Sequence, residues 1–313
     1  MRQRSTFVLI VAGFALLDIW CDLMGHSAAT SAAAAAVQAS FTNARVVWNL
    51  ALVAFCGLMV ALPTKMAAAR KMLDIAFPLI AIPFTLLYGF SGGPSAALPL
   101  ACVVVTAIAY GWLEVRLFCE AAQLPSISHI VAAVVASRVL KAIIAAVIGV
   151  LRDGAQIAVD AACVLLCGIC LACIARMGGG AVFERQASQK LAEGDRLIIV
   201  MLVVVYPALN AVARALSPLG FWGDASITGT ASIIPVAAGA AAFALVCFLI
   251  FRGCTDASIF NRMAAALVVL LGLLLVANSV ILPLITGTSA SRGVSMGIEL
   301  FSHSLFWLAA TSS

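Results

Sequence analysis

The chain has 313 residues, of which 64% are hydrophobic and 10% are charged, with 18 Lys and Arg against 13 Asp and Glu. This composition excludes a water-soluble globular domain, because such a domain exposes far more charged surface. A bilayer core about 30 Å thick needs about 20 apolar residues per helix, so the chain has room for about ten spans. The sequence therefore predicts an all-α, polytopic bundle of transmembrane helices.

Ten apolar segments follow one another, and the first has two interpretations. A basic start and the apolar run Phe7–Leu17 precede small residues at Ala28–Ala36, as in a cleaved signal peptide. Asp18 and Asp22 interrupt the tail of such a signal core, so a membrane-embedded helix is the simpler interpretation. The Ala-rich stretch His26–Ser40 is expected to form a short helix or a helical extension outside the membrane. The ten segments are 5–24, 45–63, 73–90, 97–120, 128–151, 155–175, 197–216, 231–251, 258–286 and 293–310.

Lys and Arg collect in alternate gaps between these segments. Twelve of them lie at the N-terminus and in the second, fourth, sixth and eighth gaps, against four in the remaining gaps. The other two, Arg138 and Lys141, lie inside the fifth segment. Because cytoplasmic loops are enriched in Lys and Arg, this three-to-one bias predicts that both termini lie in the cytoplasm. We expect a multi-pass protein of a bacterial cytoplasmic membrane.

The longest polar connection, residues 177–196, is the one plausible internal boundary. It separates six predicted spans in residues 1–176 from four in residues 197–313. A basic cytoplasmic loop between two helical halves is typical of the major facilitator layout. The sequence therefore predicts a facilitator-like 6+4 arrangement with an incomplete second half, although no internal repeat supports it.

Ionisable and amide side chains inside the spans are the candidate ligand-binding residues, because a charge at the bilayer centre costs about 2.5–3.5 kcal/mol. The fifth and sixth segments are joined by a short loop, so we expect them to be antiparallel neighbours and Arg138 or Lys141 to pair with Asp160. The set is predicted to line a central cavity that opens to the outside. An equally supported interpretation is that these residues hold the helices together. The set is Asp18, Asp22, Arg138, Lys141, Asp160, Asn210, Asn278 and Glu299.

Other polar and sulfur-containing residues are given structural roles. Glu114, Arg116 and Glu120 are expected to snorkel to the cytoplasmic membrane surface, and the five Trp residues to lie mostly at span ends, as interface anchors do. Cys163, Cys167, Cys170 and Cys173 share one face of a helix. Because one straight helix cannot wrap four ligands around an ion, packing is favoured over a metal site, and no metal is predicted.

No specific enzyme motif occurs in the sequence: there is no GxSxG, no HExxH and no phosphate-binding loop. We therefore expect a non-enzyme without a cofactor. Its expected partners are the lipid bilayer and an unknown small molecule.

Three passages together resemble the membrane half of LuxR-type regulators of anaerobic Actinobacteria. They are AYGWLEVRLFCEAAQLP (Ala109–Pro125), FRGCTDASIFNRMAAALVVLLGLLL (Phe251–Leu275) and GIELFSHSLFWLAAT (Gly297–Thr311). The resemblance implies a facilitator-like bundle of about twelve spans that senses a small molecule, followed by a helix-turn-helix domain that controls transcription. The chain stops at Ser313, after the tenth predicted span, so we expect that domain to be absent and no nucleic acid to be bound by this chain. The competing function is small-solute transport of the major facilitator or drug/metabolite class.

Overall fold

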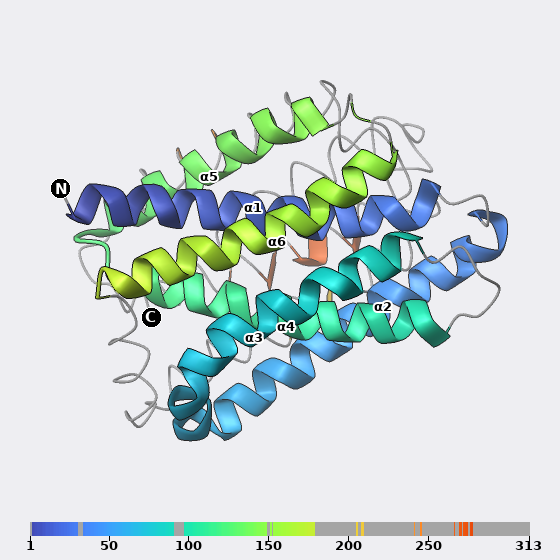
Figure 1. The fold of residues 1–313 in the computed structure, drawn as a ribbon, viewed down its shortest axis with the longest axis horizontal. Helices are drawn as coiled ribbons and strands as arrows, with labels where there is room; N and C mark the ends of the chain where they lie inside the picture. Colours follow the sequence, from blue (N-terminus) through green and yellow to red (C-terminus); the bar gives the residue numbers. More distant parts are fainter. Residues whose placement is uncertain are drawn as a thin grey trace.

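Six α-helices make up the part of the chain that the computed structural model describes (Figure 1). This part comprises residues 2–30, 34–90, 97–148, 151 and 153–178, with isolated positions between 205 and 277. For residues 2, 3, 22–30, 34–46, 60, 63, 97, 127 and 153 it covers the backbone alone. The four spans predicted in residues 197–313 lie outside it, so ten spans and the 6+4 layout stay predictions. The helices are α1 (Arg2–Thr30), α2 (Ala34–Ala61), α3 (Pro63–Phe90), α4 (Ala97–Ala121), α5 (Ile127–Ile148) and α6 (Asp153–Arg176).

Each helix matches an apolar segment that the sequence predicts, but α2 and α3 begin about ten residues earlier than expected. Helix α2 starts at Ala34 because the Ala-rich stretch has high helix propensity. Helix α3 starts at Pro63, since proline suits the first turn of a helix. The basic residues Lys65, Arg70 and Lys71 therefore lie on the first turns of α3 and not in a loop. The helical prediction for His26–Ser40 is confirmed for residues 26–30 and 34–40.

Consecutive helices run in opposite directions, so that α1, α3 and α5 begin at the end of the bundle where α2, α4 and α6 finish (Figure 1). The connections are short: Leu62 alone joins α2 to α3, residues 122–126 join α4 to α5, and residues 149–152 join α5 to α6. Short connections of this kind favour antiparallel helices.

Helix α1 is the central element of the described bundle and packs against all five other helices. Its side chains Ile10, Phe14, Leu17 and Trp20 are buried. The ring of Phe14 lies 5.5 Å from that of Phe118 on α4, measured between centroids. An apolar helix that is buried on most sides belongs in the interior of a bundle, and the other described helices surround it.

Glycines allow close approach between helices at several crossings. A Cβ added at Gly13 of α1 would lie 2.7 Å from the side chain of Leu117 on α4. A Cβ at Gly168 of α6 would lie 2.9 Å from Pro78 on α3. Small residues at helix contacts are typical of packing within membranes.

The outer faces of the helices carry large apolar side chains. Ile75 and Leu79 of α3, Ile143 of α5 and Leu165 of α6 are exposed. Within the described residues, five helices are long and apolar enough to cross a membrane, and the apolar part of α2, Val47–Met59, is shorter. The all-helical fold and these apolar helices indicate a membrane protein, as the sequence predicts.

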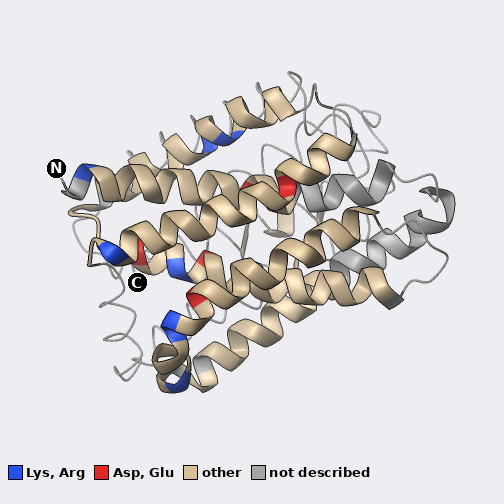
Figure 2. Cartoon of the chain, viewed as in Figure 1, with Lys and Arg blue, Asp and Glu red and all other residues tan. Residues whose placement is uncertain are grey.

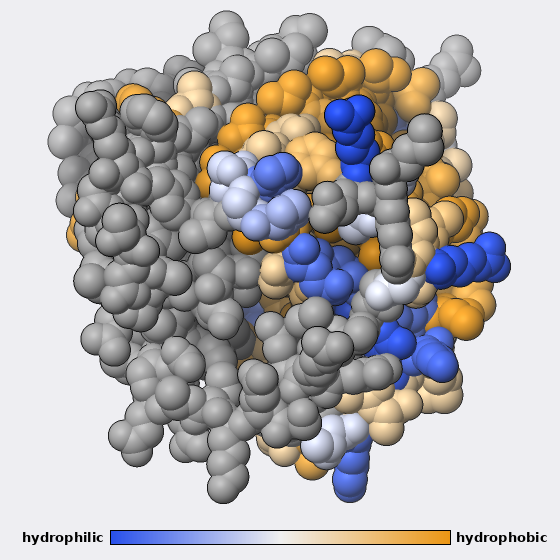
Figure 3. Space-filling model, turned by 90° about the vertical axis from the view of Figure 1, so that its left-hand side faces the viewer, coloured by the Kyte–Doolittle hydropathy of each residue, from blue (hydrophilic) through white to orange (hydrophobic). Residues whose placement is uncertain are grey.

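Positively charged residues gather at the end of the bundle where α1 and α3 begin and α6 finishes (Figure 2). Seen from that end, hydrophilic side chains cover the middle of the described surface and hydrophobic side chains lie around them (Figure 3). We call this the basic end. Its exposed cations are Arg4, Lys65, Lys71 and Arg176.

Candidate functional site

Two basic side chains of α5 converge on one carboxylate of α1, deep within the described bundle. The Arg138 guanidinium forms an ion pair with Asp18 through its Nη1 atom and Asp18 Oδ2. The Lys141 Nζ lies 3.9 Å from the same oxygen. Asp18 and Arg138 are buried, at 4% and 2% exposure, whereas the Lys141 side chain is 15% exposed. We call these three residues the α1/α5 cluster.

The local sequence explains why these residues meet. Arg138 and Lys141 are three residues apart on α5, so they project from the same face of the helix. That face packs against α1, and both helices start at the basic end (Figure 1). Arg138 lies at the midpoint of the apolar stretch Ser128–Ile148, so its charge is far from either membrane surface. Because such a charge is costly in lipid, the Asp18 carboxylate stabilises it inside the bundle.

The expected packing of α5 against α6 is wrong. Helix α5 makes extensive contact with α1 and at most marginal contact with any other described helix, and α1 lies between α5 and α6. The short connection at 149–152 brings the ends of α5 and α6 together but leaves room for α1 between them along their length. Arg138 forms an ion pair with Asp18, and Asp160 is buried on α6, so its predicted pairing with Arg138 or Lys141 stays a prediction.

The other predicted site residues cannot be placed beside this cluster. Asp22 belongs to the last part of α1, where the backbone alone is described. Asn210, Asn278 and Glu299 lie outside the described residues. The predicted central cavity therefore remains a hypothesis.

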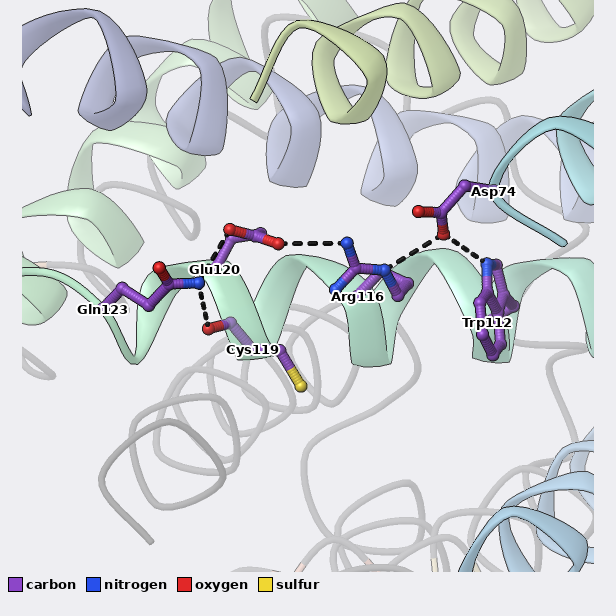
Figure 4. Close-up of polar contacts among 6 residues, drawn as sticks. All are labelled: Asp74, Trp112, Arg116, Cys119, Glu120 and Gln123. Carbon is purple, nitrogen blue, oxygen red and sulfur yellow. Dashed lines mark hydrogen bonds and ion pairs between the residues drawn. The ribbon is translucent and has the colours of Figure 1, made fainter. Parts of the chain in front are cut away.

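A second polar network joins the first half of α3 to the second half of α4, and its contacts are drawn in Figure 4. Asp74 Oδ1 accepts hydrogen bonds from Trp112 Nε1 at 2.9 Å and from Arg116 Nε at 3.0 Å. Arg116 Nη2 donates to Glu120 Oε1 at 3.0 Å, and Gln123 Nε2 donates to Glu120 Oε2 at 2.8 Å. We call these five residues the α3/α4 network. One guanidinium is thereby held between two carboxylates.

Snorkelling is the wrong description of Glu114, Arg116 and Glu120, because all three side chains are buried. Helix α4 packs against α1, α2, α3 and α6, so these side chains face other helices and not the lipid. Asp74 was not among the residues predicted from sequence. The sequence feature that could have indicated it is the spacing of Trp112, Arg116 and Glu120. This spacing places three hydrogen-bonding side chains on one face of α4. A buried stripe of that kind requires an acceptor on a neighbouring helix.

Aromatic side chains of α1, α2 and α4 pack against one another in the core of the described bundle. Trp20 is buried, and its Nε1 donates to Thr85 Oγ1 of α3 at 3.0 Å. Its ring lies 6.4 Å from that of Trp48 and 6.1 Å from that of Tyr110. Tyr110 donates a hydrogen bond to Glu114 Oε1 at 3.2 Å. Trp20, Trp48 and the equally buried Trp112 are thus core residues of the bundle and not the interface anchors that the sequence predicted.

The cysteines of α6 lie on its packed face. Cys163, Cys167 and Cys170 are buried and Cys173 is half-buried, and all four are free thiols. In the described part of the chain, no group of three or more His, Cys, Asp or Glu side chains is arranged to hold a metal ion. Small side chains on this face allow α6 to approach its neighbours closely.

Comparisons with protein-family models, with curated proteins and with solved structures gave no match. The function must therefore be argued from the described geometry and from the sequence.

Proposed function

We propose that this chain is a membrane-embedded sensor bundle that binds a small molecule between its helices, at the α1/α5 cluster. The observation that supports this proposal is that Asp18 and Arg138 are buried within apolar helices, with the partly exposed Lys141 beside them. Ionisable groups at such depth are costly, and in membrane proteins they mark ligand or ion pathways more often than other intramembrane positions do. The α3/α4 network lies nearer a helix end and is assigned a structural role.

The sensing role rests on the resemblance of residues 109–125, 251–275 and 297–311 to LuxR-type membrane regulators. In such a protein the ligand changes the relative stability of two helix arrangements, and a cytoplasmic partner responds to that change. The genomic sequence next to the codon for Ser313 gives a direct check. A basic helix-turn-helix encoded there supports the sensor proposal, and its absence moves transport to first place.

Small-solute transport is the second candidate. It is favoured by Pro78 and Pro83 within α3, because proline removes a helical hydrogen bond and lets a membrane helix bend. In this case the α1/α5 cluster would lie on the path of the solute and not in a sensing site.

A ligand screen with the purified chain tests the proposal. Compounds that bind the folded chain raise its unfolding temperature in detergent, since binding to the native state stabilises it. The matched variant carries Asp18→Asn and Arg138→Gln, which remove both charges while keeping side-chain size. Arg4→Gln at the exposed N-terminal turn is the control. We expect to find a compound that raises the unfolding temperature of the unsubstituted chain and of the control but not that of the double variant. An equal rise in the double variant would show that the compound binds elsewhere.

Flux separates sensing from transport. The chain is reconstituted in vesicles with the stabilising compound on one side. No uptake above that of empty vesicles supports sensing, whereas saturable uptake supports transport.

We also propose that the basic end faces the cytoplasm, because Lys and Arg are enriched there. Two variants test this orientation: Lys65→Cys adds a cysteine at the basic end, and Ala35→Cys adds one at the opposite end. Each variant is treated with a membrane-impermeant maleimide, and labelling of the unsubstituted chain gives the background from its own cysteines. We expect position 35 to react in intact cells and position 65 after permeabilisation. Reaction of position 65 in intact cells would reverse the orientation.

A further inference from the structure

Helix α5 joins the other described helices along a single seam, its contact with α1. In Figure 1, α5 lies at the edge of the described bundle. Ala133, Val134 and Arg138 are buried, whereas Ile143 and Val147 are exposed. The α1/α5 cluster is the charged part of this seam. A change in these three side chains therefore acts directly on how α5 is held.

The charges in the cluster are arranged as in a site for a carboxylate. The Arg138 guanidinium and the Lys141 ammonium approach one carboxylate oxygen, Asp18 Oδ2. A guanidinium offers several N–H donors in a planar fork and an ammonium offers a compact charge, and both are groups with which proteins bind ligand carboxylates. Asp18 occupies the position that the carboxylate of a ligand would take.

We propose that the ligand of this bundle is a small carboxylate that displaces Asp18 from Arg138 and Lys141 and so loosens α5 from α1. This inference rests on the proposed function, because it names the ligand class of the same site. The ligand carboxylate replaces the ion pairs that Arg138 and Lys141 lose. The seam is then held by apolar contacts and by the ligand.

The displaced Asp18 takes up one proton from the solution, since an ionised carboxylate that has lost two neighbouring cations is costly in an apolar bundle. An O–H bond forms on Asp18, and the net charge of the site is unchanged because the ligand brings one negative charge and the proton one positive charge. Binding is therefore linked to pH. The charged residues on helices that pack against α1 are the partly exposed Lys141 on α5 and a buried set, namely Arg138 on α5, Asp160 on α6, Glu114, Arg116 and Glu120 on α4, and Arg70 on α3.

Matched carboxylates and amides test the ligand class. The full chain is placed in phosphatidylcholine nanodiscs, which contain no anionic lipid. It is titrated with three carboxylates, namely acetate, succinate and benzoate, and with the corresponding amides, namely acetamide, succinamide and benzamide. Inorganic phosphate is titrated as a further anion. Unfolding temperature and calorimetric binding are measured. We expect at least one carboxylate to bind at least tenfold more tightly than its amide, with affinity rising about tenfold per unit fall in pH above the pKa of Asp18.

The Asp18→Asn variant tests displacement itself. Removing the competing carboxylate should tighten carboxylate binding about tenfold at neutral pH and abolish its pH dependence. Asp74→Asn is the control, because it removes a carboxylate from the α3/α4 network and leaves the cluster intact; it should not change the affinity. If Asp18→Asn does not fold, Arg138→Lys serves instead, and it should weaken carboxylate binding at least tenfold because the guanidinium fork is lost.

Several outcomes overturn the inference. They are weaker or unchanged carboxylate binding in Asp18→Asn, equal binding of carboxylates and amides, no carboxylate binding in either form of the chain, and phosphate binding tighter than that of every carboxylate. If one of these outcomes occurs but the binding of a neutral compound from the ligand screen requires the cluster residues, the inference fails while the proposed function stands. If no compound of any class depends on the cluster, both fail.

Discussion

The two buried polar groups of the described bundle have opposite charge patterns. In the α3/α4 network one cation, Arg116, lies between the carboxylates of Asp74 and Glu120, with hydrogen bonds of 3.0 Å to each. In the α1/α5 cluster one carboxylate, Asp18, is shared by two cations, and Lys141 is 3.9 Å away. The first joins two helices through a continuous chain of hydrogen bonds, as a structural element does. The second places two cations around one carboxylate. A ligand carboxylate can therefore replace that of Asp18.

The largest effect is expected from Arg116→Leu. It leaves Asp74 and Glu120 without the cation between them, so we expect the free energy of unfolding to fall by about 3–5 kcal/mol. Denaturation in mixed detergent micelles, followed by loss of helical signal, measures the change. Arg4→Leu, at an exposed position, is the control. A loss below about 1 kcal/mol for Arg116→Leu would contradict the structural role of the network.

A smaller loss, about 2–3 kcal/mol, is expected from Arg138→Leu, because Lys141 remains near the Asp18 carboxylate. The Asp18→Asn substitution should recover part of this loss. A double-mutant cycle between positions 18 and 138 is expected to give a coupling of about 1–3 kcal/mol. A coupling energy between Arg138 and Asp160 that exceeds the one between Arg138 and Asp18 would make Asp160 the main partner, as the sequence predicts.

Trp112→Phe should cost about 1–2 kcal/mol, since it removes the hydrogen bond to Asp74 while keeping an aromatic ring in place. Trp20→Phe removes the hydrogen bond to Thr85 and is the matched comparison outside the network. Thermal unfolding of both variants in the same detergent provides the measurement. Carboxylate affinity should be unchanged in Trp112→Phe, and a change there would show that the two polar groups are coupled.

The smallest effect on stability is expected from Lys141→Met. The ammonium is 3.9 Å from Asp18 and its side chain is partly exposed, so we expect a loss below about 1 kcal/mol. The same substitution should weaken carboxylate binding at least fivefold. A variant that loses stability as strongly as Arg138→Leu but keeps its ligand affinity would assign Lys141 to structure alone.

Hydropathy predicted the six described helices because lipid imposes a strong constraint on composition, and it also identified Asp18, Arg138 and Lys141 as charges inside spans. It did not predict which of them meet. Asp160 was expected as the partner because its segment follows that of Arg138 in the chain, whereas the structure places α1 between the two helices and pairs Arg138 with Asp18. The pairing with Asp160 stays a prediction. Order along the chain determines which helix ends are close, but side-chain size and shape determine which helix faces touch.

Asp74 shows a second limit of prediction from sequence. It is the second residue of the predicted segment 73–90, but it is not among the residues predicted for the site. Helix α3 begins at Pro63, so Asp74 lies well inside the helix, and its carboxylate accepts hydrogen bonds from Trp112 and Arg116 of α4. Hydropathy assigns a residue to a segment, but only the packing of α3 against α4 shows that this carboxylate lies in the interior.

The central place of α1 has a consequence for biosynthesis. Helix α1 emerges from the ribosome before the other described helices, and Arg138, which pairs with Asp18, follows about 120 residues after Asp18. At usual rates of synthesis the interval is on the order of 10 s. During that time α1, against which the five later described helices pack, lies at the translocon or in the bilayer without the ion pair between Asp18 and Arg138. We therefore expect the insertion of α5 to limit the rate at which the described helices assemble.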